Sequence, residues 1–196
     1  MGGRSIEDYV ASRIEAAIAA DPPEADVYAF SLWVSYVDDD PRRLEVWFGS
    51  NTEERVEASL ERASDQAEAR WNFAFWRQNQ IEMIGGDDRH GAAMFTAWFE
   101  HDLGRWFTDE EDSADPDSAY ETGSQMEFHF FRKMADVAAL LHQRAKTLGA
   151  SDRRIPIIVH ELEYYEEIAA QNERANPIDV LPAEFLTFCR NESTEP

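Results

Sequence analysis

The stretch from Val27 to Val37 reads VYAFSLWVSYV and decides the class of the fold. Its large apolar residues alternate along one face: Tyr28, Phe30, Leu32, Val34 and Tyr36. A period of two among aromatic and β-branched residues predicts a β-strand with one face in the core. Three aspartates and Pro41 then give a turn signal, and Leu44 to Phe48 predicts a second strand that returns antiparallel to the first.

Segments on both sides of this hairpin have helical spacing. Ser5 can cap a helix whose apolar residues recur every three or four positions until Asp21-Pro22 ends it. The same spacing predicts helices over 91–107, from about 124 to 148, and over 164–172. A short apolar run from Ile155 to Val159 predicts a buried strand.

The segment 70–77 is ambiguous. Trp71 to Trp76 reads WNFAFW, whose alternation favours a strand, although the helical pattern before it could continue. Residues 81–84 offer a further short strand. We therefore predict a single α+β domain over residues 1–196, with a frayed tail at 192–196. Several helices would cover a small mixed or antiparallel sheet, built from the 27–48 hairpin, the Trp71 region and the 155–159 strand.

The charge of the chain is strongly negative: 18 Lys and Arg oppose 40 Asp and Glu, which gives a formal net charge of −22. Phosphate backbones and anionic membrane surfaces attract clustered Lys and Arg, so neither nucleic acid nor a membrane is an expected partner. Aromatic residues make up 12% of the chain and supply the apolar surface that disordered acidic chains lack. The composition therefore predicts a folded acidic protein.

The chain has one cysteine, Cys189, so it can form no internal disulfide. It shows neither a signal-peptide core nor an apolar run of about 20 residues that could span a bilayer. These features predict a cytoplasmic protein. The sequence lacks the P-loop, dinucleotide-binding, zinc-helix and nucleophile-elbow patterns, so no cofactor is expected.

Residues 109–121 hold the densest run of acids. Seven of these thirteen residues are acidic, Glu121 among them, and none is basic. With Pro116 in the middle, the composition predicts a solvated acidic loop that can contact a basic partner. The candidate partner-binding residues are Asp109, Glu110, Glu111, Asp112, Asp115 and Asp117.

Asp102 is a candidate catalytic acid or base. In a helix over 91–107 it falls within an aromatic stripe, with Trp98 and Trp106 one turn away on either side. Desolvation there would raise the pKa of its carboxyl, which suits general acid-base chemistry. Two plainer explanations are that the helix ends at Gly104, or that an arginine pairs with Asp102.

Glu127 is a second candidate catalytic residue, because it projects into the apolar stripe of the long helix near Phe130 and Met134. A plainer explanation is that it lies in the first turn, where the helix dipole favours acids. Arg13 lies in the apolar stripe of the first helix. It could extend to solvent or pair with a buried acid such as Asp102 or Glu127.

His101 and His160 are candidate metal ligands. His101 adjoins Asp102, and His160 follows the 155–159 strand with Glu161 and Glu163 next to it. Alternation along the strand would place His160 on one face and the two glutamates on the other. That separation favours a structural role for His160.

Five segments spread over the chain carry a resemblance: Tyr28-Ala29-Phe30-Ser31-Leu32, Asn51-Thr52-Glu53-Glu54, Trp71-Asn72 with Trp76, Ile157-Ile158-Val159-His160, and Asn176-Pro177. Together they resemble an uncharacterised bacterial domain-of-unknown-function family of single-domain cytoplasmic proteins, sometimes found near polymorphic-toxin immunity genes. The resemblance implies an α+β fold and a protective or binding role. It implies no catalytic residues, because the family has no established activity.

Three functional hypotheses follow. The leading one is an acidic, immunity-like binding protein that recognises a basic protein partner, because opposite charge speeds encounter and favours specificity. The first alternative is an enzyme with a dispersed acid-base or divalent-metal site around Asp102 and His101. The second is a homo-oligomeric structural protein, in which surplus aromatic residues form a subunit interface.

Overall fold

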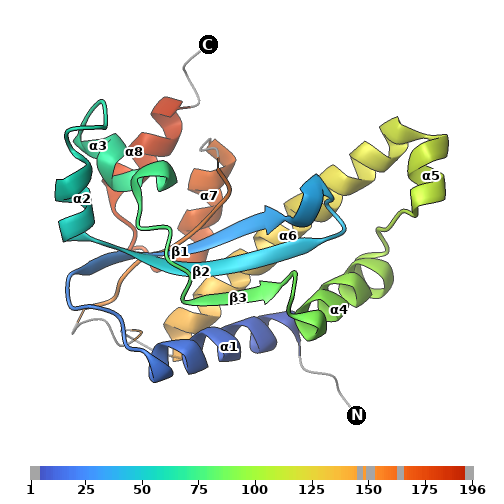
Figure 1. Cartoon of the computed structure of the whole chain (residues 1–196), viewed down its shortest axis with the longest axis horizontal. Coiled ribbons are helices and arrows are strands. Elements are labelled where there is room, and N and C mark those ends of the chain that lie inside the picture. The colour runs from blue at the N-terminus through green and yellow to red at the C-terminus, as the bar shows by residue number, and fades with distance from the viewer. Residues whose placement is uncertain (1–4, 145–147, 149–152, 163–165, 193–196) are drawn as a thin grey trace.

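The computed structural model describes residues 5–144, 148, 153–162 and 166–192. Four strands form one mixed sheet in the order β3-β2-β1-β4 (Figure 1). The strands are β1 (Val27–Tyr36), β2 (Leu44–Thr52), β3 (Glu82–Gly85) and β4 (Ile157–His160). β2 pairs antiparallel with both β1 and β3, whereas β4 pairs parallel with β1. The predicted α+β class is therefore confirmed.

Eight α-helices surround this sheet within the described part of the chain. They are α1 (Ile6–Ala20), α2 (Glu53–Ser59), α3 (Gln66–Trp71), α4 (Arg89–Ala97), α5 (Asp109–Ala114), α6 (Pro116–Arg144), α7 (Glu166–Ala175) and α8 (Ala183–Glu192). Two 3-10 turns, η1 (Val37–Asp39) and η2 (Phe73–Phe75), and one π-helical turn, η3 (Trp98–Leu103), complete the described elements. No helix among the described residues is long and apolar enough to cross a membrane.

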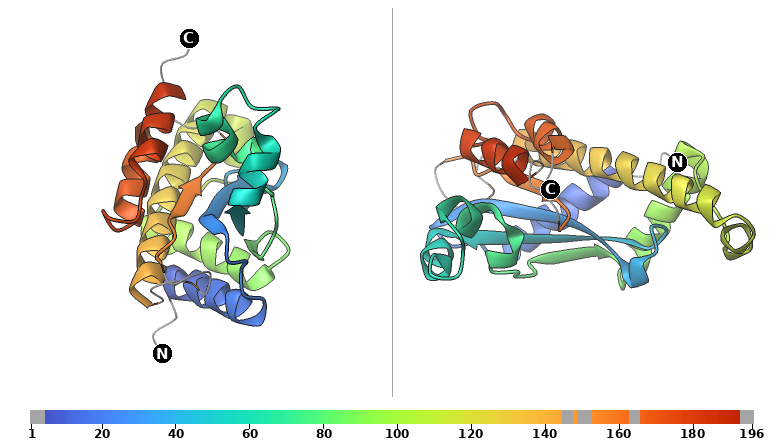
Figure 2. Two further views of the ribbon diagram at one scale, coloured as in Figure 1. Left: turned by 90° about the vertical axis from the view of Figure 1, so that its left-hand side faces the viewer. Right: turned by 90° about the horizontal axis from the view of Figure 1, so that it is seen from above.

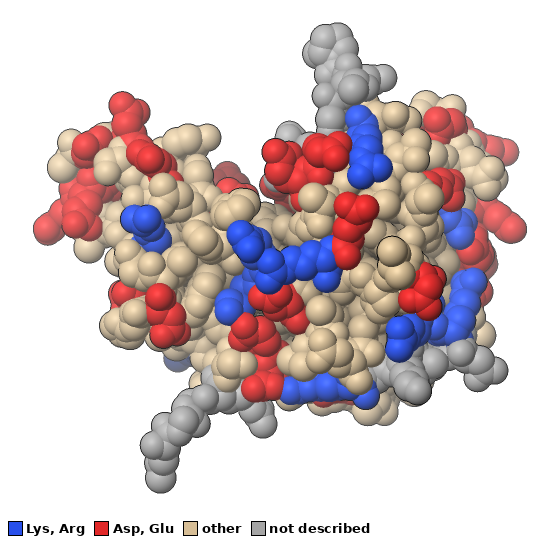
Figure 3. All heavy atoms as spheres, turned by 180° about the vertical axis from the view of Figure 1, so that it is seen from behind, with Lys and Arg blue, Asp and Glu red and all other residues tan. Residues whose placement is uncertain are grey.

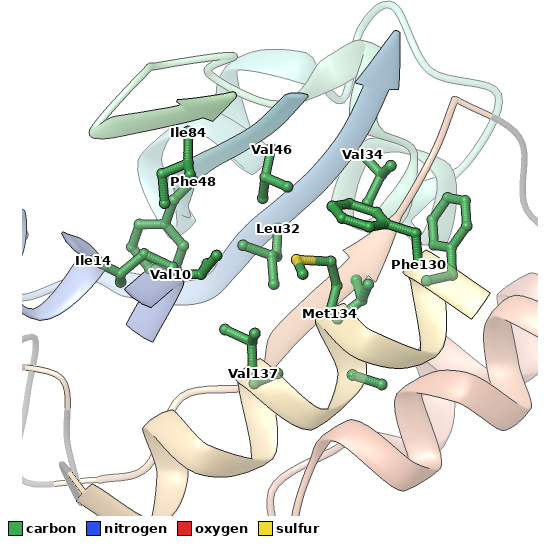
Figure 4. Packing of buried hydrophobic residues seen from close by; sticks show 14 of the residues in the cluster. Val10, Ile14, Leu32, Val34, Val46, Phe48, Ile84, Phe130, Met134 and Val137 are labelled. Atoms are coloured by element: carbon green, nitrogen blue, oxygen red, sulfur yellow. The ribbon is translucent and has the colours of Figure 1, made fainter. Parts of the chain in front are cut away.

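Alternation along the strands divides the core into two clusters, but Tyr28 leaves the face predicted for it at the register shift between Val27 and Ala29 and lies in the second cluster. Phe30, Leu32 and Val34 of β1 face α1, α4 and α6, where they meet side chains such as Ile14 and Met134 (Figure 4). On the opposite face, residues of α2, α3, η2, α7 and α8 pack with Ile158 of β4 in a second cluster around Trp71 and Trp76. Figure 2 shows this arrangement, with α7 beside β4 and α8 packed against α7 and α3.

The segment 70–77 forms no strand, which corrects the prediction. α3 ends at Trp71, and the side chain of Asn72 caps η2 by accepting a hydrogen bond from the Ala74 N–H at 2.9 Å. The third strand of the hairpin sheet is β3, which covers the 81–84 run instead. The spacing of residues in a short apolar run does not distinguish a strand from a turn, because residues in either element are apolar when they are buried.

The predicted acidic loop at 109–121 is helical, which is a second correction. α5 begins with a capping box in which Thr108 and Glu111 each accept a hydrogen bond from the other's backbone N–H. α6 then begins at Pro116 rather than near Ser124, and Asp115 accepts a hydrogen bond from the Ser118 N–H at 3.2 Å. Acids are favourable at the amino ends of helices, so this run of carboxylates starts two helices.

Other boundaries differ by a few residues. α7 runs to Ala175, and Asn176-Pro177 follows directly, as the stop signal predicts. α8 reaches Glu192, so the tail predicted at 192–196 lies outside the described residues from 193 onward.

Candidate functional site

α5 and the first turns of α6 project beyond the sheet as an arm (Figures 1 and 2). None of the six residues of α5 is buried. Asp and Glu side chains gather on the lobe that this arm forms, at the upper left of Figure 3. The six acids predicted to contact a partner all lie on this arm, and one of them, Asp112, lines a groove together with a second group of acids that the sequence analysis missed.

A groove lies between the arm and the turn that joins β1 to β2. It encloses about 680 Å³, and we call it the acidic groove. The carboxylates on its walls are Asp38, Asp39, Asp40, Asp112 and Glu127. Aromatic side chains also line it: Tyr36, Phe107 and Tyr120, the last of them 80% exposed. The signal for this site was the run of three aspartates in the hairpin turn.

Arg42 is the one basic residue among the described residues that line the acidic groove. Its Nη2 lies 2.8 Å from Oδ2 of Asp40, and its Nη1 lies 2.8 Å from Oδ1 of Asp109. The hydrogen bonds from Arg42 hold the pKa of the Asp40 carboxyl below its ordinary value. Arg42 also stacks on Phe107, with 4.7 Å between Cζ and the ring centroid. The groove therefore keeps an excess of negative charge around a base that is already paired.

Glu127 lies at the centre of α6, because the helix begins eleven residues earlier at Pro116. The helix dipole acts only near the first turn and does not explain its position, which corrects that interpretation. Instead the hydroxyl of Tyr36 donates a hydrogen bond to Oε1 of Glu127. The carboxylate is half-buried and faces the acidic groove.

Asp102 does not lie in a buried aromatic stripe. The π-helical turn η3 rotates the residues after Ala97 away from the α-helical projection, and Gly104 ends the turn in the left-handed region at φ 66°. Asp102 and His101 are both exposed, beside a shallow cleft that includes Glu7 and Lys133. Asp102 therefore lacks the desolvation on which its predicted catalytic role depended. The plainer explanation, that the helix ends at Gly104, agrees with the structure.

His160 is fully buried in the second core cluster. Its Nδ1 donates a hydrogen bond to the Glu161 carbonyl at 2.7 Å, which leaves Nε2 to accept one from the Ser31 hydroxyl at 2.8 Å. Burial lowers the pKa of His160 to about 4, so the ring is neutral. A serine hydrogen-bonded to a histidine resembles a nucleophile and its base, but Ser31 is only 4% exposed, so substrate does not reach it.

The candidate metal ligands do not converge. His101 is exposed beside α4, and His160 is enclosed beneath η2 with both ring nitrogens engaged. Within the described residues, no group of three or more His, Cys, Asp or Glu could hold a metal ion. Glu163, the other acid of that prediction, lies outside the described residues.

Arg13 pairs with acids that the sequence analysis did not consider. Its guanidinium lies 3.0 Å from Glu82 and 3.0 Å from Asp88, and it also donates a hydrogen bond to the Tyr9 hydroxyl. These contacts join α1 to β3 and to the start of α4. The pairing with Asp102 or Glu127 suggested from the sequence is wrong.

Comparison of the chain with protein-family models, with curated protein sequences and with solved structures gave no match. The geometry of the acidic groove is therefore the main support for a function.

Proposed function

We propose that this protein binds an arginine-rich segment of a basic protein partner in the acidic groove, in an immunity-like role. One observation carries the proposal: the groove between the arm and the β1–β2 turn presents five carboxylates around a single, already paired arginine. The resemblance noted in the sequence agrees with a protective binding role. We expect the partner to be met in the cytoplasm, because the chain's single cysteine forms no internal disulfide.

Three of the groove carboxylates are open to a new basic partner. Asp39, Asp112 and Glu127 form no ion pair with any described residue, whereas Asp38 and Asp40 pair with Arg43 and Arg42. Carboxylates held close together repel one another, so a cation that binds between them is attracted by all of them at once. The net charge of −22 adds long-range attraction for a basic protein.

The aromatic wall favours arginine over lysine. Tyr120 offers an exposed ring beside these carboxylates. A guanidinium is planar, so it can stack on an aromatic ring while its N–H groups bind carboxylates. Arg42 already adopts this arrangement with Phe107 and Asp40 in the same groove.

The test measures the binding of labelled hexa-arginine and hexa-lysine peptides by fluorescence anisotropy. The groove triple variant combines Asp39→Asn, Asp112→Asn and Glu127→Gln. Asn tolerates the positive φ of 56° at position 39. The α2 control variant combines Glu54→Gln, Glu57→Gln and Glu61→Gln, which removes the same charge from exposed acids remote from the groove lining.

We expect the wild type to bind hexa-arginine more tightly than hexa-lysine, and to lose both peptides at about 1 M salt. The groove triple variant should weaken hexa-arginine binding about tenfold, since each rim pair contributes about 0.5 kcal/mol. The α2 control variant should retain the wild-type affinity. Equal weakening by the two variants would indicate general charge attraction and would overturn the proposal, as would absence of binding at low salt.

A further inference from the structure

A second groove, between α6 and α7, continues the acidic groove. It encloses about 390 Å³ and has apolar walls that include Phe128, Phe131, Ala135 and Ile168. We call it the apolar groove. Phe128 is 53% exposed, which is unusual for a large apolar side chain on a helix that otherwise buries its apolar stripe.

The two grooves share part of their walls. Ser124 and Glu127 line both of them, so the acidic groove ends where the apolar groove begins. The α6 residues that line the pair form one helical stripe of two adjacent rows, within which positions recur every three or four residues: Pro116, Ala119, Gly123, Glu127, Phe131 and Ala135, and beside them the exposed Tyr120, Ser124, Phe128 and Arg132. At about 1.5 Å per residue, this stripe is roughly 28 Å long. Figure 3 shows the surface hollowed between the acidic lobe and the rest of the molecule.

We propose that one amphipathic segment of the basic partner lies along this stripe. Its basic side chains occupy the acidic groove, and the apolar residues that follow them cover Phe128 in the apolar groove. This inference rests on the proposed function and adds the partner's sequence pattern to it: a basic cluster joined directly to an apolar cluster. Burial of apolar surface then supplies affinity that salt does not screen.

The charges around the apolar groove fix the orientation of the segment. Arg132 and Arg174 line this groove, with Arg132 Cζ 5.6 Å from the Phe128 ring centroid. Arg174 also pairs with Asp136 at 2.8 Å. Glu127 and Glu167 also line the apolar groove and offset these two arginines, so this groove offers no excess negative charge, whereas the acidic groove has five carboxylates around one arginine and attracts a basic residue. The basic end of the segment therefore lies beside α5 and the apolar end beside α7.

The experiment compares three labelled peptides on the same protein. The first is hexa-arginine, the second is hexa-arginine followed by five residues of leucine, phenylalanine and alanine, and the third alternates the residues of the second. Phe128→Ser removes the exposed ring from the apolar groove. Leu60→Ser is its matched control, because Leu60 is a 45% exposed apolar residue that follows α2 and does not line either groove.

We expect the second peptide to bind wild type about tenfold more tightly than hexa-arginine, because a buried leucine or phenylalanine supplies at least that factor. Phe128→Ser should abolish this gain and leave hexa-arginine binding unchanged, whereas Leu60→Ser should change neither. The gain should persist at a salt concentration that weakens hexa-arginine binding.

Three results would overturn the inference. One is that the second peptide binds no more tightly than hexa-arginine or than the alternating peptide. Another is that Phe128→Ser retains the tighter binding of the second peptide. Light scattering could instead reveal a dimer of this chain that Phe128→Ser dissociates, which would assign the apolar groove to a second copy. Hexa-arginine binding and its loss in the groove triple variant are independent of these results, so the proposed function stands or fails separately.

Discussion

Asn176 binds the backbone of Ile157 through both ends of its side-chain amide. Oδ1 accepts a hydrogen bond from the Ile157 N–H at 2.8 Å, and Nδ2 donates one to the Ile157 carbonyl at 2.9 Å. Asn172 makes the same pair of bonds with Val159. Four residues along a helix rise about 6 Å, and two residues along a strand rise about 6.6 Å. The spacing of the Asn172 and Asn176 amides therefore matches the spacing of the Val159 and Ile157 backbone groups that point away from β1. α7 and the residue that follows it thereby satisfy the edge of the sheet where a fifth strand would lie.

Asn172→Ala should destabilise the protein by about 2 kcal/mol, because it leaves the Val159 N–H buried without a partner and the Val159 carbonyl with only the 3.4 Å hydrogen bond from Gln171. Urea unfolding would measure the loss. Asn172→Asp should also destabilise, since a carboxylate cannot donate to the carbonyl. Glu173→Ala, on the exposed side of the same helix, should change stability by less than about 0.5 kcal/mol. If the two alanine variants were equally stable, the amides would contribute nothing.

His160 should make stability depend on pH. Burial lowers its folded pKa to about 4, while the unfolded value is 6.5, so the unfolded chain binds more protons between these values. The stabilisation is complete above pH 6.5 and is lost as the pH falls toward 4, by about 3 kcal/mol in total. Carboxylates titrate in the same range, so the measurement is the difference between wild type and His160→Gln. The difference in the free energy of unfolding should shrink toward low pH. A difference that did not change with pH would contradict the lowered pKa of His160 in the folded state.

Arg42 should hold the arm against the β1–β2 turn. Arg42→Met removes its contacts with Asp40, Asp109 and Phe107. Because Asp109 is 90% exposed, the global loss should be only about 1 kcal/mol. Hydrogen exchange in α5 should accelerate. Arg43→Met, which removes an exposed pair with Asp38, is the control and should leave exchange in α5 unchanged.

Gly91 allows α4 to approach β3 closely. An added Cβ would lie 2.9 Å from the backbone nitrogen of Gly85 and 2.9 Å from Cγ2 of Ile84. Helix propensity alone predicts that Gly91→Ala stabilises by about 1 kcal/mol, whereas the steric conflict predicts a net loss of about 2 kcal/mol. The Tm measured by thermal unfolding shows whether Gly91→Ala stabilises or destabilises the protein. A higher Tm for Gly91→Ala would contradict the close approach of α4 to β3.

Local patterns predicted those features that depend on neighbouring residues. The alternation of Val27 to Val37 became the central strand β1, the apolar run before His160 became the edge strand β4, and Asn176-Pro177 did follow the end of a helix. Trp71 to Trp76 was misassigned because aromatic residues alternate in a buried turn as well as in a strand. The Thr108 and Glu111 capping box was present in the sequence and could have predicted α5.

The candidate sites depended on contacts that no local pattern contains. A helical projection placed Asp102 among tryptophans, but one π-helical turn moved it to the surface. Conversely, the three aspartates after β1 gained importance only because α5 and α6 bring Asp112 and Glu127 opposite them. The fold therefore places carboxylates that are more than seventy positions apart in the sequence around one groove.

By itself the sequence determined the α+β class, the strong negative charge and the acid-rich run at 109–121, because periodicity, composition and charge are sums over local residues. Only the tertiary structure decided that this run lies opposite the β1–β2 turn, that Glu127 accepts a hydrogen bond from Tyr36, and that Asn176 satisfies Ile157. Those outcomes depend on distances between residues remote in the chain, which are fixed when the two faces of the sheet bury their apolar side chains.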